Sequence, residues 1–148
     1  MIKKSGDHGL ALAAVSGDML EVVTFFAGGQ RCAMEARQVR ASRPLHGDDW
    51  ESYPAIDSLL GLEEGDKIRT PRQVLTIRLP EADVELSVAT PVQLRELKLD
   101  AIHPLPDLVA ARTRLRGLHA LALDEEGLTL IFDLRDLSLR AEDSRTQV

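Results

Sequence analysis

The chain has 148 residues, with 44% apolar side chains, 3% aromatic side chains and a formal net charge of −6. A negative charge with few aromatic rings argues against nucleic acid as a partner, because phosphate binding needs clustered lysine and arginine. Cys32 is the single cysteine, which excludes an internal disulfide, and no stretch approaches the roughly 18 apolar residues of a membrane-spanning helix. We therefore expect a cytoplasmic protein that does not insert into a membrane.

The first part of the chain predicts an arm followed by a hairpin. Residues 1–18 mix lysine, glycine, serine and aspartate, which is typical of a flexible N-terminal arm. Residues 20–26 are rich in β-branched and aromatic side chains, which favours a strand. A glycine turn at 27–30 then leads to a returning strand over 31–35.

The next segment is less regular. Residues 36–42 fit either a short strand or one helical turn, and Pro44 ends that element. Residues 45–53 lack an apolar pattern and predict an exposed loop. Apolar residues at helical spacing over 56–60 predict a short helix, which Gly61 ends.

A second hairpin is predicted from alternating apolar and polar residues. The alternation runs over 73–79 and 84–88, on either side of a polar turn at 80–83. Thr90-Pro91 then either interrupts or ends the second strand, and the alternation resumes over 92–97.

Two prolines within 101–106 require an extended backbone there. Asp107 is placed to cap a short helix over 108–114 through its side-chain oxygens. These features predict an extended segment followed by one or two helical turns.

The last hairpin is the most apolar part of the chain. Residues 118–123 and 128–132 are strand-length apolar runs around the polar loop 124–127, whose glycine can adopt the positive φ that closes such a turn. The second run is apolar on both faces, which predicts a strand inside a sheet. Replacing Leu130 with alanine should then cost about 2–5 kcal/mol. Asp133 is expected to mark the point where the chain leaves the core.

These elements amount to about seven to ten short strands joined mostly by hairpins. Strands do not alternate with helices, which argues against a parallel sheet and favours a mainly β protein with a small closed or nearly closed barrel. We expect a single domain over 19–140, followed by a C-terminal tail over 141–148.

The sequence shows no recognisable catalytic or metal-binding group. None of the histidines has another histidine or cysteine at ligand spacing (His8, His46, His103, His119). Asp57 and Asp133 could be paired carboxylates of a small enzyme, with His103. The stronger interpretation is that each ends an apolar strand and caps the next turn.

We therefore expect no catalytic residue, no metal site and no cofactor. An acidic, mainly β domain without such groups most often presents its surface to another protein. Hydrophobic patches and strand addition at sheet edges are the usual contacts.

Three segments resemble the CheW-like adaptor domain of bacterial chemotaxis. Residues 22–44 are similar to its opening hairpin and the strand after it. The run Tyr53-Pro54-Ala55-Ile56-Asp57-Ser58-Leu59-Leu60-Gly61 resembles its Pro-Val-Ile-Asp-Leu segment. Residues 117–137 resemble its closing hairpin, with Phe132-Asp133-Leu134 in place of Leu-Asp-Leu. The resemblance covers residues 20–138.

The resemblance implies two small five-stranded β-barrel subdomains packed around a shared core, with one or two short helices. It also implies a non-catalytic adaptor that couples methyl-accepting chemoreceptors to a CheA-type histidine kinase, whose regulatory domain has the same fold. The contact residues that it implies here are Val39, Arg43, Tyr53 and Ile56.

The sequence departs from the family just before Pro54. The family has Leu-Arg-Gly in a region on which receptor coupling depends, and this chain has Asp49-Trp50-Glu51-Ser52-Tyr53. A second hypothesis is therefore a CheW-like signalling module that binds a different protein or associates with itself.

Overall fold

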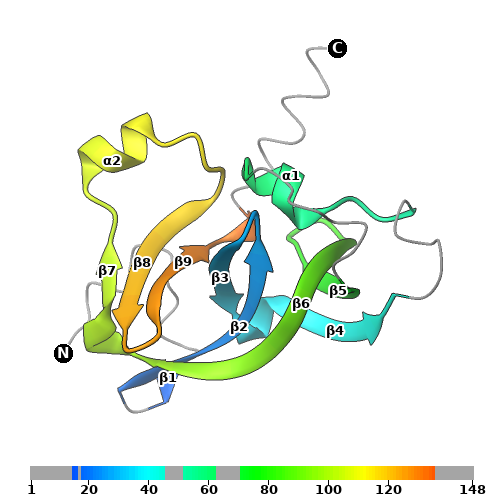
Figure 1. Cartoon of the computed structure of the whole chain (residues 1–148), viewed down its shortest axis with the longest axis horizontal. Coiled ribbons are helices and arrows are strands. Elements are labelled where there is room, and N and C mark those ends of the chain that lie inside the picture. Colours follow the sequence, from blue (N-terminus) through cyan, green and yellow to red (C-terminus); the bar gives the residue numbers. More distant parts are fainter. Residues whose placement is uncertain (1–14, 17, 46–51, 63–70, 136–148) are drawn as a thin grey trace.

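The computed structural model describes residues 15–16, 18–45, 52–62 and 71–135 (Figure 1). The described strands are β1 (Val15–Ser16), β2 (Met19–Ala27), β3 (Gln30–Glu35), β4 (Val39–Pro44), β5 (Arg72–Arg78), β6 (Asp83–Lys98), β7 (Ile102–Pro104), β8 (Leu118–Asp124) and β9 (Gly127–Phe132). The helices are short: η3 (Ala36–Gln38), α1 (Ile56–Leu60), η5 (Leu99–Ala101) and α2 (Asp107–Arg112). The prediction of a mainly β protein with few short helices is confirmed.

The strands form one curved sheet in the order β4-β5-β6-β2-β3-β9-β8-β7, with β1 paired to β2. Every ladder is antiparallel except that between β3 and β9, which pairs Cys32 with Leu130 and Ala33 with Ile131 in parallel. The prediction against a parallel sheet is confirmed, but this one parallel ladder was not expected. They come together from distant parts of the chain, and no local pattern in the sequence signals their contact.

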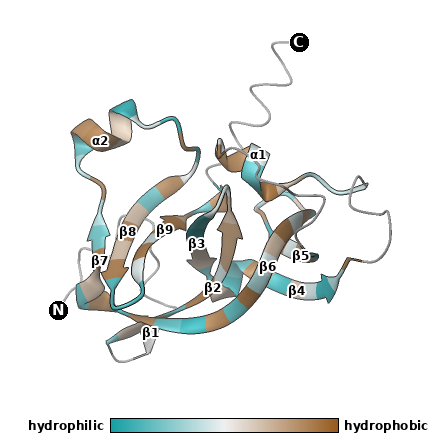
Figure 2. Ribbon diagram, in the orientation of Figure 1, coloured by the Kyte–Doolittle hydropathy of each residue, from teal (hydrophilic) through white to brown (hydrophobic). Residues whose placement is uncertain are grey.

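The centre of the sheet is buried on both faces. Successive side chains of a strand point to opposite faces, so one strand can serve two cores. Val23, Cys32 and Phe132 lie in the larger of two hydrophobic cores, whereas their chain neighbours belong to the smaller one (Val22, Ala33, Ile131). Figure 2 shows the resulting hydrophobic colour along β2 and β9. Two packed halves that share β2, β3 and β9 explain why these strands are apolar on both faces.

The three predicted hairpins are confirmed as β2–β3, β5–β6 and β8–β9. The last turn is tighter than expected, because Asp124 pairs with Gly127 and leaves only Glu125 and Glu126 between the strands. Gly127 has a φ of 109°, a conformation that side-chain-bearing residues rarely adopt.

β6 is a single strand through Thr90-Pro91. Its first half pairs with β5 and its second half with β2, and Ala89 pairs with both Arg72 and Phe26. Pro91 lies where the ladder with β2 is irregular, beyond the last pair with β5. A proline is tolerated there because no ladder requires its missing N–H.

The predicted helix and its end are confirmed in α1. Ile56 and Leu60 are fully buried in the larger core, and Gly61 ends the helix with a φ of 89°. A Cβ atom at Gly61 would lie 2.9 Å from the carbonyl oxygen of Arg114. Both the backbone conformation and this close approach therefore require glycine.

Three local expectations are wrong. α2 begins at Asp107 itself, without a side-chain cap, so this carboxylate favours the first turn by its charge alone. Ala101 belongs to η5, so the extended segment begins at Ile102, the first residue of β7, and Pro106 is extended as expected. The core continues past Asp133, because Leu134 is also buried.

Several predictions fall wholly or largely outside the described residues. These are most of the N-terminal arm, most of the loop over 45–53, and the tail over 141–148. Val15–Ser16, at the end of the predicted arm, pairs with Met19 and Leu20, so that short piece is attached to the sheet.

Candidate protein-contact site

The structure places three of the four predicted contact residues on β4 or beside it, with Val39 packed against the larger core. Val39 begins β4 and is half-buried, Arg43 lies exposed near its end, and Tyr53 is half-buried just before α1. Ile56 is fully buried in the larger core. Ile56 therefore positions α1 and does not itself present a contact surface.

Arg43 and Tyr53 form a direct pair. The Arg43 guanidinium carbon lies 5.1 Å from the centre of the Tyr53 ring, and Arg43 Nη2 donates a hydrogen bond to the Tyr53 hydroxyl oxygen. Glu85 Oε2 on β6 lies 3.7 Å from the same nitrogen. The hydrogen bond to Tyr53 raises the pKa of the Arg43 guanidinium, with Glu85 acting in the same direction.

A second ion pair continues this surface along β4. Arg40 Nε lies 2.8 Å from Asp83 Oδ2 at the start of β6. We call these five side chains the β4 surface (Arg40, Arg43, Tyr53, Asp83, Glu85). β4 stands at one end of the sheet order and residues 40–44 are exposed. An edge strand with exposed side chains can offer both backbone groups and charged heads to a partner.

A buried ion pair joins α1 to β5. Asp57 Oδ1 on α1 accepts a hydrogen bond of 2.9 Å from Arg72 Nη2 on β5, and both side chains are only 4% exposed. Arg72 also donates to the hydroxyl and carbonyl oxygens of Ser87 on β6. The N–H of Gly28 donates to Asp57 Oδ2. The prediction that Asp57 ends a strand is wrong, because it lies in the first turn of α1.

Asp133 has different partners. Its Oδ1 accepts hydrogen bonds from Gln38 and from the backbone N–H of Arg135, and its Oδ2 accepts from the Arg135 guanidinium. Burial raises the pKa of the Asp133 carboxyl, but the hydrogen bonds and charge of Arg135 outweigh it and hold that pKa below its usual range. The backbone contact is the local turn cap that the sequence predicts.

The proposed enzyme residues have separate surroundings. Asp57 bonds to β5 and the β2–β3 turn, Asp133 bonds to η3 and to its own turn, and His103 is exposed on β7. Among the described residues, no hydrogen bond joins any two of these three groups. No cluster of three potential metal ligands occurs in the same part of the chain; His8 and His46 lie outside it.

Comparisons with known proteins address the fold. No family model and no curated protein matches the sequence. The structure is similar to that of the scaffolding protein TtCheW from Thermoanaerobacter tengcongensis, with a TM-score of 0.61 and 13% sequence identity. The similarity covers 80% of this chain and 91% of that chain. The fold is CheW-like.

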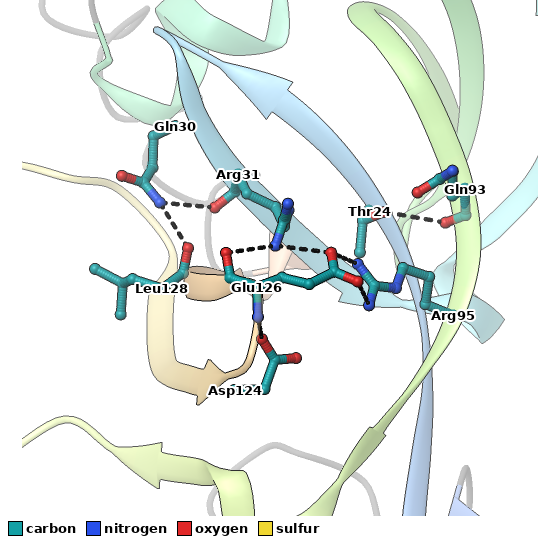
Figure 3. A network of polar contacts seen from close by, with 8 residues as sticks. All are labelled: Thr24, Gln30, Arg31, Gln93, Arg95, Asp124, Glu126 and Leu128. Carbon is teal, nitrogen blue, oxygen red and sulfur yellow. Dashed lines mark hydrogen bonds and ion pairs between the residues drawn. The ribbon is translucent and has the colours of Figure 1, made fainter.

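One polar network of this CheW-like fold was not anticipated from the sequence. Figure 3 shows Glu126, in the β8–β9 turn, between Arg31 of β3 and Arg95 of β6. Arg95 donates two hydrogen bonds of 2.6 Å to the Glu126 carboxylate, and Arg31 Nη1 lies 3.2 Å from Glu126 Oε1. The hydrogen bonds from Arg95 lower the pKa of Glu126. The three residues are far apart in the chain, so no spacing motif could reveal them.

Cys32 in the larger core should be chemically inert while the protein is folded. Burial raises the pKa of its thiol to about 12, and the Asp57 carboxylate acts in the same direction. Because the thiolate is the reactive form, we expect a disulfide reagent at pH 8 to label the native protein about a hundredfold more slowly than the protein in urea. Prompt labelling of the folded protein would contradict this burial.

The described part of this CheW-like domain contains no helix that is long and apolar enough to cross a membrane.

Proposed function

We propose that this chain is a non-catalytic, cytoplasmic adaptor in a chemotaxis-type signalling pathway. Its partners in this proposal are the regulatory domain of a CheA-type histidine kinase, a methyl-accepting chemoreceptor, or both. The observation that supports it most is the structural similarity to a protein described as a scaffolding protein, over 80% of this chain. The sequence resemblance over three ordered segments supports the same assignment.

The arrangement of charges suits a contact surface better than a reaction centre. In the β4 surface, Arg43 presents a planar cation supported by an aromatic ring, and arginine and tyrosine are enriched among the residues that dominate protein interfaces. Asp57 and Asp133, in contrast, are each held by an arginine in a structural role. We therefore assign partner binding to the β4 surface, with Val39 at its border.

A titration of the full chain with a CheA-type regulatory domain tests the proposal. We expect Arg43→Ala and Tyr53→Ala each to weaken binding about tenfold, as loss of an interface anchor does. Arg112→Ala is the matched control: it removes an exposed arginine from α2, away from the β4 surface, and its effect should be much smaller. Isothermal titration calorimetry provides the measurement.

Absence of binding to both the kinase domain and a receptor fragment at high micromolar concentration would overturn the proposed partners. The second hypothesis would then gain weight, because Tyr53 ends the segment that lacks the family's Leu-Arg-Gly. Sedimentation equilibrium of the chain alone would detect self-association. A dimer that Arg43→Ala dissociates would assign the β4 surface to a second copy.

A further inference from the structure

The second half of β6 has an open backbone edge. Residues 93–98 pair with β2 on one side, whereas β5 pairs only with residues 83–89. Among the described strands, none pairs with the other side of residues 92–98. The strand is amphipathic in this region, with Leu97 buried and Glu96 and Lys98 exposed. Unpaired edges of this kind are templates for an added strand.

A cavity of about 400 Å³ lies between this part of β6 and the β8–β9 hairpin. Four successive residues of β6, 95–98, and four of the β8–β9 hairpin, 123–126, line it. Because successive side chains of a strand point to opposite faces, a cavity lined by four residues in a row includes the backbone edge of the strand as well as one of its faces. We call this cavity the β6 groove. In Figure 1 the tip of the β8–β9 hairpin lies near the end of β6.

The β6 groove has an apolar interior and an acidic rim. Leu97 is buried, Met19 is half-buried, and Leu123 is 61% exposed, which is high for a leucine that lines a cavity. Arg95 is already neutralised by Glu126. The remaining charged side chains are three acids and one base (Glu96, Asp124, Glu125, Lys98).

We propose that the β6 groove is a docking site for an extended basic segment of a partner protein, which adds as a strand to the open edge of β6. Its aliphatic groups would cover Leu97 and Leu123, and its lysine or arginine heads would approach Glu96, Asp124 and Glu125. The long methylene stems of lysine and arginine suit such a site because they bury carbon and leave the charge at the rim. The β6 groove lies at the opposite end of β6 from Glu85, so this partner contact is distinct from the β4 surface.

The direct test uses a fluorescent peptide as the probe, acetyl-Leu-Lys-Val-Lys-Leu-Lys-amide, with the full chain and anisotropy as the readout. We expect Asp124→Asn with Glu125→Gln to weaken binding about tenfold, as expected for two lost ion pairs near a partly desolvated surface. Asparagine at position 124 can still accept the hydrogen bond that the backbone N–H of Glu126 donates to Asp124. Asp107→Asn with Glu81→Gln is the matched control, since it changes the net charge equally at exposed sites elsewhere.

Two further comparisons separate strand addition from simple charge attraction. A peptide with N-methyl groups on its leucines keeps its charge but loses two N–H donors, and the methyl groups obstruct strand pairing along that edge, so it should bind at least tenfold more weakly. Leu123→Ser should weaken binding, whereas Leu108→Ser, at an equally exposed leucine on α2, should not. Urea unfolding of each variant confirms that it is folded.

Equal affinity of the two double variants, or of the methylated and unmethylated peptides, would overturn the proposal. Displacement of the peptide by an equal concentration of spermidine would show a site for small cations and would also overturn it. These results are independent of the kinase titration, because Arg43→Ala should leave peptide binding unchanged. The two proposals can therefore fail separately.

Discussion

Replacing Arg72 with methionine should lower the free energy of unfolding by about 3–5 kcal/mol, because it leaves the Asp57 carboxylate buried without its counter-charge. Arg72 also holds the hydroxyl and carbonyl oxygens of Ser87, so these acceptors lose their donor in the same variant. Urea unfolding followed by circular dichroism measures the change. Arg78→Met is the matched control, since Arg78 ends the same strand and is exposed; it should change the stability by less than about 0.5 kcal/mol.

A double variant tests whether the buried charge of Asp57 causes the loss of stability in Arg72→Met. Asp57→Asn in the Arg72→Met background removes the uncompensated charge and should recover part of the lost stability, although Asp57→Asn alone destabilises the protein. Asparagine also keeps an acceptor for the N–H of Gly28. If Arg72→Met costs no more than Arg78→Met, or if the double variant is the least stable of all, the ion pair does not hold α1 to the sheet.

Local patterns in the sequence predicted the hairpins well. The alternation over 73–79 and 84–88 and the glycine turn after β2 each contain the full signal for their element, because register and turn are set by neighbouring residues. The end of α1 at Gly61 is likewise determined by neighbouring residues. The family resemblance then predicted how these separate elements assemble into a fold, because the same elements occur in the same order in that family.

Contacts between distant segments were missed for the same reason. The parallel pairing of β3 with β9, the Asp57–Arg72 ion pair and the bridging of Glu126 all join residues that no turn connects. An aspartate beside an apolar run has the same appearance whether it caps a turn, as Asp133 does, or accepts from a buried arginine, as Asp57 does. Only the three-dimensional arrangement distinguishes the two. Likewise, the open edge of β6 depends on where the pairing of β5 with β6 ends, which the sequence of β6 alone does not show.

The second large effect concerns Leu130, whose replacement with alanine should cost about 2–5 kcal/mol. Its side chain is 8% exposed and packs in the larger core. Leu128→Ala is the matched control: it makes the same change two residues earlier on β9, where the side chain is 43% exposed, and it should be near neutral. Urea unfolding of both variants provides the comparison. Equal, small losses would show that β9 does not form the interior of the sheet.

The rate at which the Cys32 thiol is labelled reports on unfolding close to Leu130 in the same variants. Cys32 is the ladder partner of Leu130 across the parallel pair, and its thiol can react only when the surrounding core opens. If the two halves of the domain unfold together because they share β2, β3 and β9, thiol labelling in Leu130→Ala should accelerate by the factor that its lost stability predicts. Acceleration without a matching loss of global stability would instead show that β9 separates from β3 while the rest of the sheet stays folded. That outcome would contradict a single cooperative sheet joining the β4 surface to the β6 groove.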